Sequence, residues 1–147
     1  MSVHLLDVNV LIALSWPSHI HHSSAHRWFS EERGDGFATC PMTQCGFIRI
    51  SANSLIIPDA VSVPKARDHL RLLMAHPDHV FWNDDVNPCE KDGLPAALMG
   101  GHRQVTDAYL VALACRRRGK LVTLDQRIPK ALKNSRFAES VVLIALD

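Results

Sequence analysis

Three aspartates stand at positions from which their carboxylates can act together. Asp7 and Asp125 each end an apolar run, and Asp107 lies in the first turn of a predicted helix. Alone, the first two are typical of turns and the third of a helix N-terminus. Two carboxylates about 4 Å apart repel by about 4 kcal/mol at an effective dielectric near 20. Three in one place therefore need shifted pKa values or a cation, and oxygen-only ligands favour Mg²⁺ or Mn²⁺.

These aspartates meet only if the elements around them form a particular architecture. Apolar runs and turn residues predict strands at 3–6, 36–40, 79–82, 120–125 and 140–146, and helical periodicity predicts helices at 9–15, 22–32, 41–53, 63–75, 106–118 and 128–134. Strands that alternate with helices predict an α/β fold, with a central parallel sheet of about five strands and helices on both faces. In such a sheet the carboxyl ends of the strands share the edge where ligands bind.

The helix predicted at 106–118 has the clearest boundaries in the chain. Thr106 is the expected cap at its start, and Gly119 follows a basic last turn. Arg116, Arg117 and Arg118 in that turn are expected to be solvated cations that favour a helix C-terminus.

Length and composition bound the class of protein. The chain of 147 residues suits one domain over 1–147, and 47% hydrophobic with 21% charged residues excludes a disordered chain. The formal net charge is only +1, yet residues 101–147 hold nine Lys or Arg against four Asp or Glu, which permits a polyanionic partner. Four cysteines without CxxC spacing indicate a reducing cytoplasm, and no signal-like or membrane-length apolar stretch is found.

Four segments carry a resemblance to a known family. In order and spacing, "LLDVNVLIAL", "ATCPMTQCGFIRIS", "QVTDAYLVALA" and "LVTLDQRI" resemble the PIN-domain fold, and closely the VapC-type toxins of bacterial type II toxin–antitoxin systems. The similarity covers nearly the whole chain. It implies a toxic, metal-dependent endoribonuclease that hydrolyses RNA phosphodiester bonds, uses Mg²⁺ or Mn²⁺, is inhibited by a small antitoxin protein, forms a homodimer and needs no membrane.

The resemblance also assigns site residues. It makes Asp7, Asp107 and Asp125 the first, third and fourth acids of the catalytic cluster, and we expect the first two to bind the metal directly. Asp125 is then an outer ligand or positions a water, and Asn9 supports the cluster. The family commonly has Glu as its second acid, where this chain has Gln44. Glutamine still forms hydrogen bonds but brings no charge, so it is expected to support the site with a lower metal affinity.

Basic residues near the predicted acidic edge are the candidates for RNA contacts. Arg103 precedes Asp107, and the others follow Asp125: Arg127, Lys130 and Lys133. Lys and Arg side chains supply most of the phosphate contacts in nucleic-acid complexes.

Two other groups of residues invite a site. His22 and His26 lie four apart on a predicted helix, which is a zinc spacing, but the Glu of an HExxH motif is missing beside His22. Asp84 and Asp85 lie in a loop after a predicted strand. They are expected to be turn residues, with replacement of the missing second acid as the alternative.

Two other functions are open at this point. A phosphatase of the haloacid-dehalogenase type also has an aspartate after its first strand, but its motif places a second acid where this chain has Asn9, and an amide does not shuttle protons. A PIN-like module weakened by Gln44 would instead only bind RNA or a partner.

Overall fold

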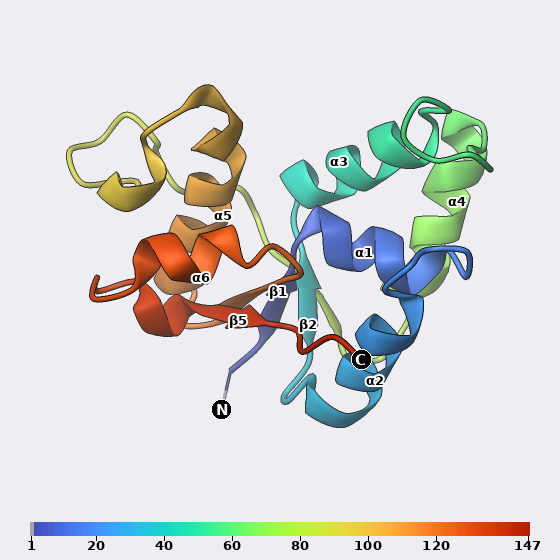
Figure 1. The fold of residues 1–147 in the computed structure, drawn as a ribbon, viewed down its shortest axis with the longest axis horizontal. Helices are drawn as coiled ribbons and strands as arrows, with labels where there is room; N and C mark the ends of the chain where they lie inside the picture. The colour runs from blue at the N-terminus through green and yellow to red at the C-terminus, as the bar shows by residue number, and fades with distance from the viewer. Residues whose placement is uncertain (1) are drawn as a thin grey trace.

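The computed structural model describes residues 2–147 and contains a five-stranded parallel sheet in the order β3-β2-β1-β4-β5 (Figure 1). The strands are β1 (His4–Leu6), β2 (Phe37–Thr39), β3 (His79–Phe81), β4 (Lys120–Thr123) and β5 (Val141–Leu143). The predicted α/β class is thus confirmed, and each strand is a shorter piece of the segment predicted from the sequence.

Helices cover both faces of the sheet. They are α1 (Val8–Ser15), α2 (His22–Glu32), α3 (Pro41–Ser51), α4 (Val63–Met74), α5 (Val105–Arg116) and α6 (Arg127–Leu132), with short 3-10 turns at Ala96–Leu98, His102–Gln104 and Ala138–Ser140. Figure 1 shows α1 to α4 on one side of the sheet and α5 and α6 on the other. No helix in the described part of the chain is long and apolar enough to span a membrane.

Alternating side chains of the central strands build one core on each face. Leu5 and Leu121 pack into the cluster that contains α5, whereas Leu6 and Val122 pack into the cluster that contains α1. Successive residues of a strand point to opposite faces, so a strand covered on both sides is apolar throughout. This explains why β1 and β4 are continuous apolar runs up to their polar ends.

The pairing of β1 with β4 fixes the edge that matters for chemistry. Leu6 is in register with Val122, and the backbone N–H of Asp7 donates to the carbonyl of Val122 over 2.9 Å. Asp7 therefore leaves the sheet beside Thr123, the last residue of β4. Helix α1 starts directly after Asp7, so this carboxylate stays at the carboxyl edge of the sheet.

Both predicted boundaries of the helix at 106–118 need correction. Helix α5 starts at Val105 without a side-chain cap, and Thr106 is exposed in its first turn. At the other end Arg118 takes the left-handed backbone conformation, with φ of 55°, that was expected of a glycine. Gly119 is needed for a different reason, because a Cβ there would collide with the carbonyl oxygen of Val3 and the ring of Trp82.

Candidate acidic site

Asp7 is buried at the start of α1, where its carboxylate accepts three hydrogen bonds. Oδ1 accepts from the backbone N–H of Val8 at 2.7 Å. Oδ2 accepts from the hydroxyl of Thr123 at 2.7 Å and from the amide of Asn9 at 3.4 Å. Burial raises the pKa of Asp7, the bonds from Thr123 and Val8 lower it, and the charge of Asp125 raises it.

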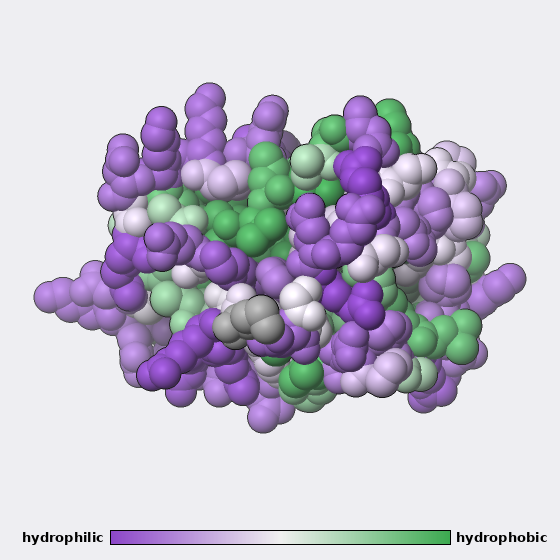
Figure 2. Space-filling model, turned by 90° about the horizontal axis from the view of Figure 1, so that it is seen from below, coloured by the Kyte–Doolittle hydropathy of each residue, from purple (hydrophilic) through white to green (hydrophobic). Residues whose placement is uncertain are grey.

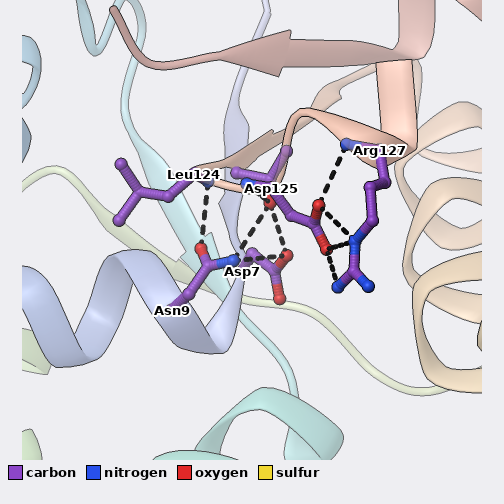
Figure 3. A network of polar contacts seen from close by, with 6 residues as sticks. Asp7, Asn9, Leu124, Asp125 and Arg127 are labelled. Carbon is purple, nitrogen blue, oxygen red and sulfur yellow. Dashed lines mark hydrogen bonds and ion pairs between the residues drawn. The ribbon is translucent and has the colours of Figure 1, made fainter. Parts of the chain in front are cut away.

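Asn9 ties the start of α1 to the end of β4. Its Nδ2 donates to the Thr123 hydroxyl at 3.2 Å, and its Oδ1 accepts from the backbone N–H of Leu124 at 3.1 Å (Figure 3). The N–H of Asp125 also donates to the Thr123 hydroxyl, at 3.1 Å. Thr123 thus joins two of the predicted acids, and we did not predict it from the sequence. Its signal was a polar residue inside an apolar strand, two positions before an aspartate.

Asp125 forms an ion pair with Arg127 across the first turn of α6 (Figure 3). The guanidinium donates from Nε to Oδ1 at 3.0 Å and from Nη2 to Oδ2 at 2.8 Å, and the backbone N–H of Arg127 donates to Oδ1 at 2.9 Å. The hydrogen bonds from Arg127 hold the pKa of Asp125 below its usual value despite partial burial.

Asp107 lies in the first turn of α5 and is the least satisfied of the three acids. Within residues 2–147 its carboxylate accepts no hydrogen bond and forms no ion pair. Burial raises its pKa to about 6, and the charges of Asp7 and Asp125 act in the same direction, while Arg127 opposes them. These couplings mean that the three carboxylates occupy one neighbourhood, although they come from three elements far apart in sequence.

A small pocket of about 140 Å³ opens at this neighbourhood. Its lining comprises Leu98, Arg103, Gln104, Asp107, Asp125, Arg127 and Ile128. Two of the four cations predicted for RNA contacts therefore flank the acids. Lys130 and Lys133 are exposed on and just after α6 and do not line this pocket.

The donor set fits a hard divalent cation. The carboxylate of Asp107 has unused oxygens and is repelled by the charges of Asp7 and Asp125. The three acids offer only oxygen ligands, which Mg²⁺ and Mn²⁺ prefer. Among the described residues no group of three or more acidic, His or Cys side chains is close enough to hold an ion. Asp107 and Asp7 would therefore hold the metal with waters in its remaining positions, as Mg²⁺ commonly retains them.

Gln44 is not joined to the three acids. Its Nε2 donates to the hydroxyl of Thr39 at 3.0 Å and lies 3.6 Å from the sulfur of Met74. The same hydroxyl contacts Nε2 of His79 at 2.8 Å. Burial lowers the pKa of His79, and its ring and the amide of Gln44 share the hydroxyl of Thr39. This amide links α3 to β2 and α4.

The loop aspartates have structural partners. Asp84 accepts from the backbone N–H of Met42 at 3.1 Å, near the start of α3. Asp85 forms ion pairs with Arg116 and Arg117, so these arginines are not simply solvated.

The paired histidines connect two helices. His22 bonds the carbonyl of Ala13 at 2.7 Å and His26 that of Leu14 at 3.1 Å, so each ring holds α2 against the end of α1. Their rings also contact edge to face, with centroids 4.4 Å apart. These bonds account for both side chains without a metal.

The sequence is similar to those of known proteins. Residues 4–133 match the family described as PIN domain. Ribonuclease VapC38 of Mycobacterium tuberculosis is 47% identical over 121 residues, which cover 82% of this chain and 84% of that protein. Ribonuclease VapC39 of the same organism is 43% identical, with 82% and 87% covered, and Ribonuclease VapC29 is 42% identical, with 82% and 84% covered. The similarity therefore spans the fold and is not confined to one motif.

Proposed function

Because this chain belongs to the PIN-domain family, and within it to the VapC-type ribonucleases, we propose that it is the endoribonuclease toxin of a toxin–antitoxin pair. The observation that carries the proposal is that Asp107 and Asp125 line one pocket with Arg103 and Arg127, while Thr123 joins Asp125 to Asp7. Carboxylates that repel one another and flanking cations suit a metal and a phosphate chain.

The proposed reaction is hydrolysis of an RNA phosphodiester. A water oxygen bonds to phosphorus, one ester P–O bond breaks, and the leaving oxygen takes up a proton. A bound Mg²⁺ or Mn²⁺ would lower the pKa of that water and neutralise phosphate charge. Asp7 and Asp107 would hold the ion, while Asn9 and Thr123 keep Asp7 oriented through their hydrogen bonds.

A cleavage assay on total RNA tests this proposal. We expect cleavage with Mg²⁺ or Mn²⁺, none with a chelator, and a loss of at least about 100-fold in Asp7→Asn and Asp107→Asn, since each removes a ligand charge. Asp59→Asn, an exposed acid outside the site, is the matched control and should cleave normally. Cleavage at wild-type rates by both site variants would reject the assignment.

The same experiment separates the other two functions. Metal-independent RNA binding without cleavage would indicate a binding module. A trapped aspartyl-phosphate on Asp7 would indicate a phosphatase. The phosphatase is not favoured, because Asn9 uses both ends of its amide in fixed hydrogen bonds and has no proton to shuttle.

The antitoxin, the homodimer and the cytoplasmic location belong to the same proposal. Apolar side chains outside the cores support protein contacts: Figure 2 shows hydrophobic side chains exposed on one face of the molecule, and Leu143 of the edge strand β5 is 42% exposed. Phe81 of the opposite edge strand is 49% exposed. Light scattering at two concentrations tests the dimer, and co-purification with the product of a neighbouring short reading frame tests the antitoxin.

A further inference from the structure

The carboxylates of the site differ in how many acceptor positions they have left. A carboxylate offers about four lone-pair positions. Asp125 receives four contacts, all from Arg127: the backbone N–H and Nε on Oδ1, and Nε and Nη2 on Oδ2. Asp7 receives three, and Asp107 receives none within residues 2–147. The single Nε–H is shared between both oxygens, so three N–H groups occupy Asp125 and three donors occupy Asp7, but only those on Asp125 include a guanidinium cation. A metal ion therefore finds free oxygens on Asp107, a partly free carboxylate on Asp7, and a carboxylate already paired with a cation on Asp125.

Arg127 is placed for this role by local structure. It lies two residues after Asp125, so its own N–H and its side chain approach the same carboxylate as α6 begins. Its side chain is 83% exposed, whereas that of Asp125 is 20% exposed. The planar guanidinium meets both oxygens, which the single point charge of a lysine does not do. The arginine thus acts on the carboxylate and is not required by the core.

We propose that Arg127 is a positioning residue that keeps Asp125 out of the coordination shell of the metal, so that Asp7 and Asp107 hold a single ion. This inference rests on the proposed function, because it concerns the same site. Asp125 then acts as an outer carboxylate, and the exposed guanidinium of Arg127 is held beside the metal by that carboxylate. Arg127 occupies the oxygens of Asp125, and Asp125 fixes the position of the Arg127 guanidinium.

Mn²⁺ binding, measured by electron paramagnetic resonance of the free ion, tests the inference without an activity assay. We expect wild type to bind one Mn²⁺ per chain and Arg127→Gln to bind Mn²⁺ about tenfold more tightly, because a positive charge leaves and a carboxylate becomes a ligand. Arg116→Gln is the matched control, since it removes an exposed arginine from an Arg–Asp pair outside the site, and should bind as wild type does.

Three further variants complete the test. Asp125→Asn should bind Mn²⁺ within about threefold of wild type, whereas Asp107→Asn should lose binding. Adding Asp125→Asn to Arg127→Gln should cancel the gain, which a double-mutant cycle measures directly. Circular dichroism confirms that each variant is folded.

Two results would overturn the inference: Arg127→Gln binding Mn²⁺ as wild type does, or Asp125→Asn losing Mn²⁺ as completely as Asp107→Asn. Failure of the proposed function has a different signature. A wild type that shows the expected Mn²⁺ pattern but leaves RNA intact would reject the ribonuclease and keep the role of Arg127.

Discussion

At the residue scale, the protonation of Asp107 should control the metal binding that we propose. Its pKa is raised to about 6 by burial and by the charges of Asp7 and Asp125. Metal ligands must be deprotonated, so a proton on Asp107 competes with the ion. We therefore predict that Mn²⁺ affinity is nearly constant above pH 7 and falls about tenfold per pH unit once the pH drops well below 6. A titration of free Mn²⁺ from pH 5 to 8 measures this, and equal affinity at pH 5 and 7.5 would contradict it.

The same carboxylate affects the stability of the metal-free protein. The folded-state pKa of Asp107 lies above its value of about 3.9 in an unfolded chain. The folded protein therefore binds this proton more tightly, and the contribution of Asp107 to the free energy of unfolding becomes less favourable as the pH rises through 6. We predict that Asp107→Asn is more stable than wild type at pH 7.5, by on the order of 1 kcal/mol after allowance for solvent screening.

Comparison of the two proteins at each pH isolates this residue. The difference should shrink as the pH falls below 6 and vanish only below about pH 4, where Asp107 is protonated in both the folded and the unfolded state. Burial lowers the pKa of His19 and His79, so their contributions to the free energy of unfolding change with pH in the opposite direction. Both histidines are present in wild type and variant, so these contributions cancel in the comparison. Urea denaturation of the chelator-treated proteins measures the difference. A variant that is less stable than wild type at pH 7.5 would show that the charge of Asp107 is compensated in another way.

Two strand ends and one helix start predicted the local positions of Asp7, Asp125 and Asp107. Each follows from a local pattern, and the parallel sheet brings the three ends together. The partners of the side chains were not predictable in the same way. Gln44 turns to Thr39 and Met74 because those groups lie within reach in the folded chain, and Met74 is thirty positions away in sequence.

At the element scale, helices α3 and α1 approach closely beside Asp7. Gly46 of α3 has no room for a side chain, because a Cβ there would lie 2.7 Å from Cγ2 of Val8. Val8 is the first residue of α1, and its N–H holds the Asp7 carboxylate. We predict that Gly46→Ala destabilises the protein by about 1 kcal/mol, since overpacking of about 1–3 kcal/mol exceeds a gain in helix propensity of about 1 kcal/mol.

Shortening the side chain of Val8, the partner of Gly46 in this contact, provides the control. Gly46→Ala combined with Val8→Ala should recover most of the stability, because the second substitution makes room for the new methyl group. Urea denaturation of the two single variants and the double variant gives the coupling between the positions. If the double variant is no more stable than Gly46→Ala, the close approach of these helices is not the cause.

Helical periodicity and short apolar runs predicted the six helices and five strands, including the edge strands β3 and β5, which are only partly buried. They did not predict the 3-10 turns at 96–98 and 102–104, which lead into α5 and place Arg103 at the pocket. These turns have no apolar repeat of their own. The end of α5 was predicted wrongly because two features fall on neighbouring residues. Arg118 has the left-handed backbone conformation, whereas Gly119 lies too close to its neighbours for a side chain.

At the scale of the whole molecule, a nearly neutral chain has its positive charge unevenly placed. The net charge is +1, yet nine of the sixteen Lys and Arg lie in residues 101–147, and Arg103 and Arg127 from this part line the pocket with the acids. Phosphate contacts release counterions, so RNA affinity should fall as salt rises. Because the acids beside these cations repel phosphate in the metal-free protein, few contacts should form there without the ion.

We therefore predict that RNA binding depends on the metal as well as on salt. With a non-cleavable RNA analogue, Mn²⁺ should raise the affinity, and the slope of log affinity against log salt should drop by about 0.7 in Arg103→Gln, as expected for one lost phosphate contact on a single strand. Arg67→Gln removes an exposed arginine from α4, on the other face of the sheet, and should leave the slope unchanged. Fluorescence anisotropy between 50 and 200 mM salt covers the range in which such slopes are resolved. Equal slopes for Arg103→Gln and wild type would mean that RNA reaches the acids by a path that does not pass this arginine.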